Sequence, residues 1–106
     1  MRKLEVALLI IAFGAFIPGT AFADGAADYK AKCAMCHGAD AAGNTPMGKK
    51  LGIHDLRSDE TKKLTDAQLI TIVTAGKNKM PSFKDKLSHD QITALVAYIR
   101  DLQQKK

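Results

Sequence analysis

Apolar residues recur at helical spacing in two segments of the second half of the chain. After position 88 they form one stripe along a helix: Ile92, Leu95, Val96, Ile99 and Leu102. After position 65 a shorter segment has the same character: Leu69, Ile70, Ile72 and Val73. No segment alternates between apolar and polar residues as a half-buried strand would. The pattern therefore predicts an all-α fold.

Capping signals mark where these two helices begin. The sequences at 65–68 (T-D-A-Q) and 88–91 (S-H-D-Q) place a hydroxyl residue three positions before a glutamine. Each of the two side chains then satisfies a backbone N–H of the other residue. Gly76 is expected to end the first of these helices, and the second runs on to the last lysines of the chain.

The first half of the chain has weaker signals. A third helix is predicted from Asp24 to the cysteines at 33 and 36, because alanine and lysine, which are common there, are good helix formers. Residues 38–64 are rich in Gly, Asn, Pro and Asp. This composition predicts a loop with one short turn at 55–57.

The first 23 residues have the layout of a secretory signal peptide. Arg2 and Lys3 give a basic start, residues 6–17 are apolar and uncharged, and small residues precede the expected cleavage point after Ala23. An uncleaved membrane anchor is the alternative, since the uncharged stretch from Val6 to Ala23 is at the lower limit of a membrane span, but Pro18 and Gly19 interrupt it. We expect export to the periplasm and no stable membrane insertion after cleavage.

Composition limits what the remaining domain, residues 24–106, can be. The whole chain is 46% hydrophobic and 25% charged, which excludes wholesale disorder. After cleavage 14 basic and 10 acidic residues remain, a formal charge of +4. A glycine-rich phosphate loop and a basic stripe with aromatics are both missing, so no nucleic acid partner is expected. Only Tyr29, Phe83 and Tyr98 remain as aromatics, and a core this small needs a cofactor, a metal or a disulfide.

The sequence Cys33-Ala34-Met35-Cys36-His37 has the C-x-x-C-H form of an attachment site for c-type haem. Two intervening residues space the thiols for the two vinyl groups on one side of the porphyrin. The adjacent histidine is then held beneath the iron. This interpretation assigns one covalently attached haem c to Cys33 and Cys36, makes His37 an iron ligand, and supplies the missing core.

Three other uses of the two cysteines fit the sequence less well. A thioredoxin-like redox pair needs a strand–helix context that this chain lacks. A structural zinc site needs four ligands, and His54 and His89 stand at no recognised zinc-finger spacing from the cysteines. A disulfide across a two-residue gap would add little stability.

Met80 is the predicted second ligand of the iron. It lies in 76–83 (G-K-N-K-M-P-S-F), between the two capped helices, where a core methionine would have no helical face to join. Pro81 restricts Met80 to extended conformations, and a His/Met ligand pair raises the reduction potential of a haem. The alternatives as second ligand are Met35, Met47, His54 and His89.

With these motifs the chain resembles the class I monohaem c-type cytochromes, the small soluble electron carriers of bacterial and photosynthetic chains. The resemblance covers nearly all of residues 24–106. It rests on C-A-M-C-H, on K-N-K-M-P-S-F at 77–83 and on the apolar C-terminal helix with A-Y-I at 97–99. It implies a small cytochrome c fold of three to five helices wrapped around one haem.

The resemblance also assigns roles to individual residues. It implies that Cys33 and Cys36 hold the haem, that His37 is the proximal ligand and that Met80 is the distal one. Gly25 and Tyr29 would lie where the first helix crosses the last, near Leu95 and Tyr98. It further suggests that the carbonyl of Pro46 accepts the His37 N–H, a contact that would fix the orientation of the ring.

The function predicted from these features is electron transfer by a monomer that is not an enzyme, because two axial ligands leave the iron no open position for a substrate. Redox partner proteins are expected, and acidic ones would dock at a lysine-rich haem edge. An ordinary solvated basic surface is the alternative. The lysines concerned are Lys30, Lys32, Lys77, Lys79, Lys84 and Lys86.

Two further functions remain open at this point. One is a ligand-binding or peroxidatic haem protein with a labile distal ligand. The other is a fixed cytochrome subunit of one redox complex. Binding of carbon monoxide to the reduced protein separates the first from a carrier, and copurification separates the second.

Overall fold

The computed structural model describes residues 20–105, with side chains from Asp24 onward. These residues form six helices: α1 (Thr20–Lys32), α2 (Ala34–His37), α3 (Pro46–Leu51), α4 (Asp59–Lys62), α5 (Asp66–Ala75) and α6 (His89–Gln104). Within this part of the chain extended pairing is limited to one isolated bridge between Lys77 and Met80. The predicted all-α class is confirmed, with one helix more than the upper number expected.

The predicted signal segment, residues 1–23, lies outside the described side chains, and only the backbone of 20–23 is described. There α1 begins at Thr20, four residues before the predicted start at Asp24. None of the helices in the described part of the chain is long and apolar enough to cross a membrane.

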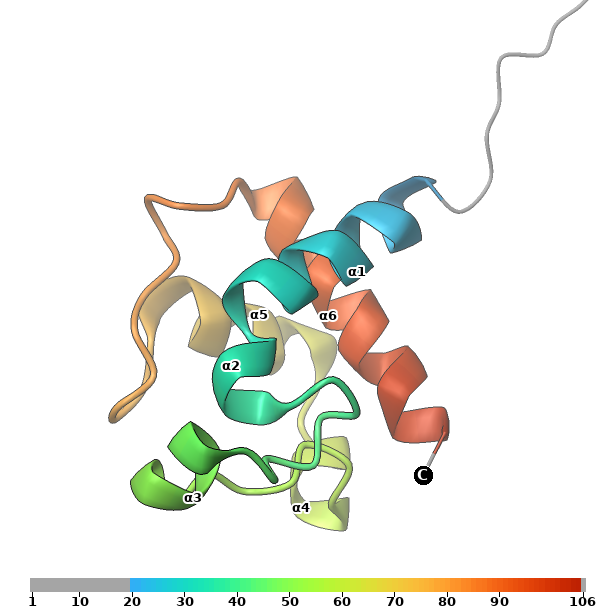
Figure 1. The fold of residues 1–106 in the computed structure, drawn as a ribbon. Helices are drawn as coiled ribbons and strands as arrows, with labels where there is room; N and C mark the ends of the chain where they lie inside the picture. The colour runs from blue at the N-terminus through green and yellow to red at the C-terminus, as the bar shows by residue number, and fades with distance from the viewer. Residues whose placement is uncertain (1–19, 106) are drawn as a thin grey trace, which may run out of the picture.

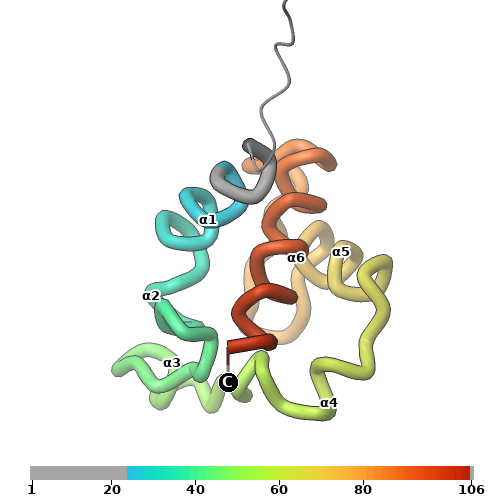
Figure 2. Tube along the Cα trace, turned by 90° about the vertical axis from the view of Figure 1, so that its right-hand side faces the viewer, coloured from blue at the N-terminus to red at the C-terminus, as the bar shows by residue number. Residues whose placement is uncertain are grey.

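Helix α1 crosses α6, and this crossing holds the two ends of the described chain together (Figures 1 and 2). A side chain on Gly25 would overlap the backbone carbonyl of Ala94, so the crossing needs glycine there. One turn further along α1, the buried ring of Tyr29 lies 5.4 Å from the ring of Tyr98, centroid to centroid. The predicted crossing of the first and last helices is confirmed.

Helices α5 and α6 begin at the two predicted capping boxes. The Thr65 hydroxyl accepts from the Gln68 N–H at 3.1 Å, while the Gln68 carboxamide oxygen accepts from the Thr65 N–H at 2.8 Å. Ser88 and Gln91 repeat this exchange at 3.1 and 2.7 Å. Helix α5 ends at Ala75, directly before Gly76, as predicted.

The prediction of a loop over residues 38–64 was wrong in part, because α3 and α4 lie in it. Thr45 caps α3, with Pro46 as the first helical residue, and its hydroxyl accepts from the Gly48 N–H at 2.8 Å. Ser58 caps α4 in the same way. Both helices are only four to six residues long. Their capping residues are therefore a weaker signal for a helix than the surrounding Gly, Asn and Pro are for a loop. The turn predicted at 55–57 is present, closed by Asp55, which accepts from the Arg57 N–H at 2.7 Å.

Figures 1 and 2 show α3 and α4 at the end of the molecule where α6 finishes. The α1–α6 crossing occupies the opposite end, and α2 and α5 lie between the two ends.

Candidate functional site

An apolar cavity lies between the α1–α2 segment, helices α5 and α6, and the loop that carries Met80. Its walls are Tyr29, Cys33, His37, Leu56, Leu69, Ile72, Val73, Met80, Leu95 and Ile99. Three of the four predicted site residues line it: Cys33, His37 and Met80. The fourth, Cys36, is half-buried on α2 and does not reach the cavity wall. Some of the apolar residues predicted on α5 and α6 are on the wall as well: Leu69, Ile72, Val73, Leu95 and Ile99.

The two cysteines are positioned by the junction of α1 and α2. Cys33 is the residue before α2 begins, and its carbonyl accepts from the N–H groups of Cys36, at 3.2 Å, and of His37, at 2.9 Å. Both thiols are free. Cys33 is buried, 6% exposed, and burial, reinforced by the nearby charge of Asp28, raises its pKa to about 11. Its thiol is therefore protonated at neutral pH.

His37 presents a neutral imidazole to the cavity. Its Nδ1 atom is enclosed and has no hydrogen-bond partner among the described residues. Burial lowers the pKa of His37 below its ordinary value, because charging the ring without water is costly. Neutral imidazole is the form that binds a metal. A buried polar atom without a partner is also unusual enough to point to a missing group.

The hydrogen bond suggested between His37 and the Pro46 carbonyl is not formed in this structure. Thr45, the residue before Pro46, connects this loop to the C-x-x-C-H motif instead. The Thr45 hydroxyl donates to the Cys36 carbonyl at 2.8 Å while accepting from the Gly48 N–H. A side chain on Gly48 would overlap the Cys36 carbonyl. The loop before α3 therefore packs on the backbone of the C-x-x-C-H motif.

Met80 is held at the cavity by a tight turn. The Lys77 N–H donates to the Met80 carbonyl at 3.1 Å, and the Met80 N–H donates to the Lys77 carbonyl at 2.9 Å. Asn78 has a φ of +55° in this turn, a conformation that asparagine tolerates better than most residues. Gly76 has a φ of +80°, and a Cβ there would lie 2.8 Å from the Met80 carbonyl oxygen. The backbone before Met80 therefore requires glycine.

Two further hydrogen bonds connect the chain after Met80 to the end of α5. The Phe83 N–H donates to the Val73 carbonyl at 3.1 Å, and the Ser82 hydroxyl donates to the Thr74 carbonyl at 2.6 Å. Pro81 lies between these anchors and the turn. The backbone that carries the half-buried Met80 is therefore held on both sides.

None of the alternative second ligands reaches the cavity. Met35 is 74% exposed and Met47 is 37% exposed, while His54 and His89 are exposed. Within residues 24–105, no three His, Cys, Asp or Glu side chains form a group that could hold a metal ion on their own. The described residues therefore offer the iron of a haem one histidine and one methionine on a shared cavity.

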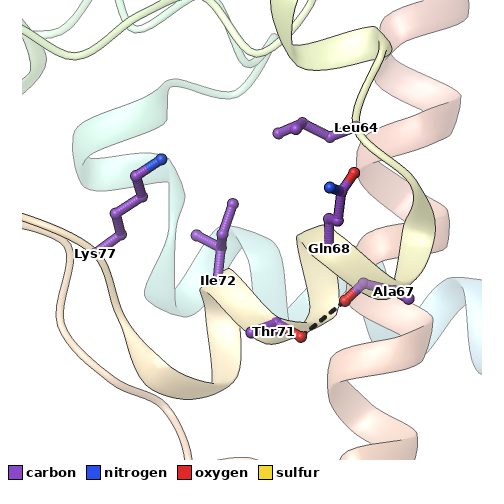
Figure 3. Close-up of a pocket in the computed structure, with 6 residues that line it drawn as sticks. All are labelled: Leu64, Ala67, Gln68, Thr71, Ile72 and Lys77. Atoms are coloured by element: carbon purple, nitrogen blue, oxygen red, sulfur yellow. Dashed lines mark hydrogen bonds between the residues drawn. The ribbon is translucent and has the colours of Figure 1, made fainter.

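An open groove continues the cavity along α5, with Ile72 on the border between them. Its walls are Leu64, Ala67, Gln68, Thr71, Ile72 and Lys77. In Figure 3 the side chains of Leu64, Gln68, Ile72 and Lys77 point into the same space above α5. We call the cavity and the groove together the crevice. It is apolar at its inner end, open at its outer end and bordered there by polar side chains.

The crevice fits a haem on three observations of the described residues. Apolar side chains from four elements form the walls that a porphyrin face needs. A neutral histidine and a thioether, both established axial ligands of haem iron, border the same cavity. The buried Cys33 thiol lies on the same cavity wall as His37, and the Cys36 thiol lies one helical turn after Cys33. The open groove gives the edge of the ring a way to solvent.

Sequence reasoning missed several residues that shape this site. The buried hydroxyl of Tyr29 donates to the Gly38 carbonyl at 2.6 Å, directly after His37, and burial raises the pKa of Tyr29. Leu56 and Leu64 form walls from segments predicted to be loop. Tyr29 was expected only at the crossing of the first and last helices. No local signal marks its bond to Gly38 or the wall positions of Leu56 and Leu64, because these contacts join residues that are not neighbours in the sequence.

Comparisons with known proteins agree with this geometry. The family model described as cytochrome c oxidase, cbb3-type, subunit III, matches residues 20–99. Cytochrome c6 of Leptolyngbya boryana is 36% identical over 77 residues, which cover 73% of this chain and 87% of the relative. Cytochrome c6 of a Nostoc species is 33% identical over 105 residues, covering 91% and 84%.

A solved structure is similar over the same region. The KustC0563 c-type cytochrome aligns with a TM-score of 0.69 and 32% sequence identity. The alignment covers 74% of this chain and 96% of the solved one. The similarity therefore extends over almost the whole of that protein and most of the present chain.

Proposed function

The chain belongs to the small monohaem c-type cytochromes and carries one covalently attached haem c, and on that premise we propose that it carries single electrons with His37 and Met80 as the axial ligands. The observation that carries this proposal is the meeting of the His37 and Met80 side chains on one apolar cavity. The two residues come from elements 43 positions apart in the sequence, so the fold, and not a local motif, brings them together.

Cys33 and Cys36 are the proposed attachment points of the haem. Each thiol would add across one vinyl group and form a thioether. The position of Cys33 on the cavity wall supports its role directly. Cys36 is half-buried on α2 and belongs to the same short segment, so its role rests on the C-x-x-C-H spacing.

The chain's own residues would control the electron transfer in three ways. The bound haem supplies the one-electron couple of its iron. His37 and Met80 would be the two ligands that the chain offers the iron, and a thioether ligand favours the reduced state, which raises the potential. The apolar walls from α5 and α6 exclude water, and low polarity also disfavours the more highly charged oxidised state. The open groove leaves one edge of the site accessible to a partner.

A redox titration of the purified holoprotein tests this function. We expect a reversible transition of one electron and no binding of carbon monoxide by the reduced protein, because Met80 fills the sixth position. Rapid binding of carbon monoxide at neutral pH would contradict the carrier function. That result would support a ligand-binding or peroxidatic haem protein with a labile distal ligand.

The family model favours a second candidate function, since its description names a subunit of a cytochrome c oxidase. In that case the protein would be a fixed component of one redox complex. Copurification from gently solubilised membranes separates the two functions. A carrier is recovered free as a monomer, whereas a subunit remains with its complex at stoichiometric amounts.

We propose that residues 1–23 are a signal peptide and that the protein works in the periplasm. The proposal rests on the basic start, the apolar run and the small residues before position 24. Intact mass and N-terminal sequencing of the exported holoprotein test it. A mature chain that starts at Asp24 is expected, and a chain that keeps residues 1–23 would instead support a membrane anchor.

Acidic redox partners are proposed to dock near the open end of the crevice. Lys77 is on the groove wall, and Lys79, Lys84 and Lys86 are exposed on the same loop. Exposed charges of one sign steer association, and salt screens them. The electron-exchange rate with an acidic partner should therefore fall steeply as ionic strength rises. A flat response would show that these lysines are an ordinary solvated surface.

A further inference from the structure

Two side chains of α6 hold backbone carbonyls of the segment that carries α4. The Gln103 carboxamide donates through Nε2 to the Leu56 carbonyl at 2.8 Å. The Arg100 guanidinium donates through Nη2 to the Leu64 carbonyl. The two side chains are also joined to each other, because Arg100 Nη1 donates to Gln103 Oε1 at 3.0 Å. Residues 56–64, here called the strap, are therefore attached to α6 at both ends.

Every side-chain nitrogen and oxygen of Arg100 and Gln103 has a hydrogen-bond partner. Gln103 is only 4% exposed, and it is the one fully buried side chain with an amide or a charge among residues 24–105. A buried amide is costly unless its polar atoms are paired, and both the oxygen and the nitrogen of Gln103 have partners. All three nitrogens of the half-buried Arg100 donate as well, the third to Asp66 at 2.8 Å. An arginine near the surface rarely donates a hydrogen bond within the protein from all three of its nitrogens.

The strap has few other attachments. Its first residue donates its N–H to the buried Ala41 carbonyl at 2.9 Å. In the middle, α4 makes no extensive contact with another helix of the described chain, and the residues from Asp59 to Lys63 are exposed or half-buried. Apart from the Arg100–Gln103 pair, the far end of the strap is held by the turn in which the Leu64 N–H donates to the Thr61 carbonyl and by its continuation into α5.

Both attached ends of the strap are walls of the crevice. Leu56 lines the closed cavity together with Cys33 and His37. Leu64 lines the open groove, where its side chain points into the space above α5 (Figure 3). The carbonyls that Gln103 and Arg100 hold are those of these same two residues. The position of each leucine in the crevice is thus fixed by one side chain of α6.

We propose that Arg100 and Gln103 are positioning residues that hold the strap closed as one wall of the haem site and thereby keep water from the haem. This inference deepens the proposed function, since it names what maintains the apolar surroundings of the electron-carrying group. Release of the strap would admit water beside the haem. Water stabilises the more charged oxidised state, so the reduction potential would fall.

The test uses haem-loaded protein with the substitutions Arg100→Met and Gln103→Leu, which keep side-chain bulk and remove the hydrogen bonds. Amide hydrogen exchange is measured in the oxidised state, together with the reduction potential. The strap amides to follow are Lys62, Lys63 and Leu64, and the reference amides on the other wall are Cys33 and His37, all of which donate to backbone carbonyls.

We expect exchange of the strap amides to become about tenfold faster in both variants, the scale of one lost charged or buried hydrogen bond. The reference amides should be unchanged, and the potential should be lower. Arg100→Lys should behave like Arg100→Met, because lysine keeps the charge but cannot hold several acceptors in a fork. Lys105→Met is the matched control, since it removes only the exposed pair between Lys105 and Asp101 on α6, and it should change neither readout.

An equal acceleration of strap and reference amides with an unchanged potential would overturn the proposal, because it would show a general contribution to stability. Unchanged exchange in the strap would also overturn it. Should Arg100→Met not fold, Asp66→Ala removes only the exposed branch of the network and should give a smaller acceleration of the same amides. The sulfur–iron band of Met80 tests the proposed ligation separately, because the strap does not contact Met80 through any of these bonds.

Discussion

The two proposed axial ligands lie on one cavity but are supported in different ways. His37 is on α2, directly after α1, and α1 is packed against α6 at a crossing that needs Gly25. Met80 is in a loop, where a tight turn and two hydrogen bonds to the end of α5 hold it. The proximal ligand thus depends on the core of the fold, whereas the distal ligand depends on a small number of local contacts.

This difference predicts which of the two proposed ligands, His37 or Met80, dissociates from the iron first. Loops with few buried contacts open locally at a lower free energy than helices of the core. Loss of Met80 from the iron should therefore be possible in a protein that is still folded. Loss of His37 should require the α1–α6 crossing to come apart, so it should coincide with global unfolding.

The largest effect is expected from His37→Ala, which removes the ligand on the core side. The variant should fail to accumulate as a folded holoprotein, because the iron loses its proximal ligand and the small core loses the group that fills it. Haem staining of expressed protein, normalised to total chain, measures this loss. His54→Ala is the control, since His54 is exposed and away from the cavity, and it should accumulate normally.

Gly25→Ala should destabilise the whole protein by about 2 kcal/mol, the usual scale of overpacking. The new methyl group would overlap the Ala94 carbonyl and push α1 away from α6. Denaturant unfolding followed by far-ultraviolet circular dichroism gives the free energy of unfolding. The midpoint of the circular dichroism transition should fall to a lower denaturant concentration, and a change confined to the Met80 signal would contradict the assignment of Gly25 to the core.

Gly76→Ala should affect the distal ligand first, at a local cost of about 1–3 kcal/mol. Its φ of +80° disfavours alanine, and the new Cβ would press on the Met80 carbonyl and the Ser82 nitrogen. The sulfur–iron band should weaken at denaturant concentrations where circular dichroism is unchanged. Coincident loss of both signals would show that the loop and the core form one cooperative unit.

Ser82→Ala should produce the smallest effect in this series, about 1 kcal/mol. It removes the 2.6 Å hydrogen bond to the Thr74 carbonyl but leaves the turn and the Phe83 anchor in place. The rate of imidazole binding to the oxidised protein measures how often Met80 leaves the iron, and this rate should rise severalfold. Thr93→Ala, which removes an exposed hydroxyl on α6 away from the crevice, should leave the rate unaffected.

Much of the fold could be predicted because its signals are local. The capping boxes at Thr65 and Ser88 place α5 and α6. The crossing at Gly25 and Tyr29 was implied by the resemblance to the c-type cytochromes, and the structure has it. The C-x-x-C-H motif predicts Cys33 and His37 as site residues, and the position of Met80 before Pro81 predicts it as the second ligand. The structure brings all three to one cavity.

The parts that could not be predicted depend on long-range contacts or on very short elements. Helices α3 and α4 are so short that their capping residues, Thr45 and Ser58, compete with surrounding loop composition. The strap is held by Arg100 and Gln103 across 36 and 47 positions of sequence. Such bonds depend on how α6 is rotated in the folded core, which no local pattern encodes.

The proposed ligand pair is tested most directly by the optical spectrum of the oxidised holoprotein beside that of Met80→Ala. The account predicts a weak sulfur-to-iron charge-transfer band at the red end of the visible spectrum. In Met80→Ala the band should vanish while the haem stays covalently attached, and Met47→Ala should keep it. A wild-type spectrum without the band, or a band that survives in Met80→Ala, would contradict the assignment of Met80 to the iron.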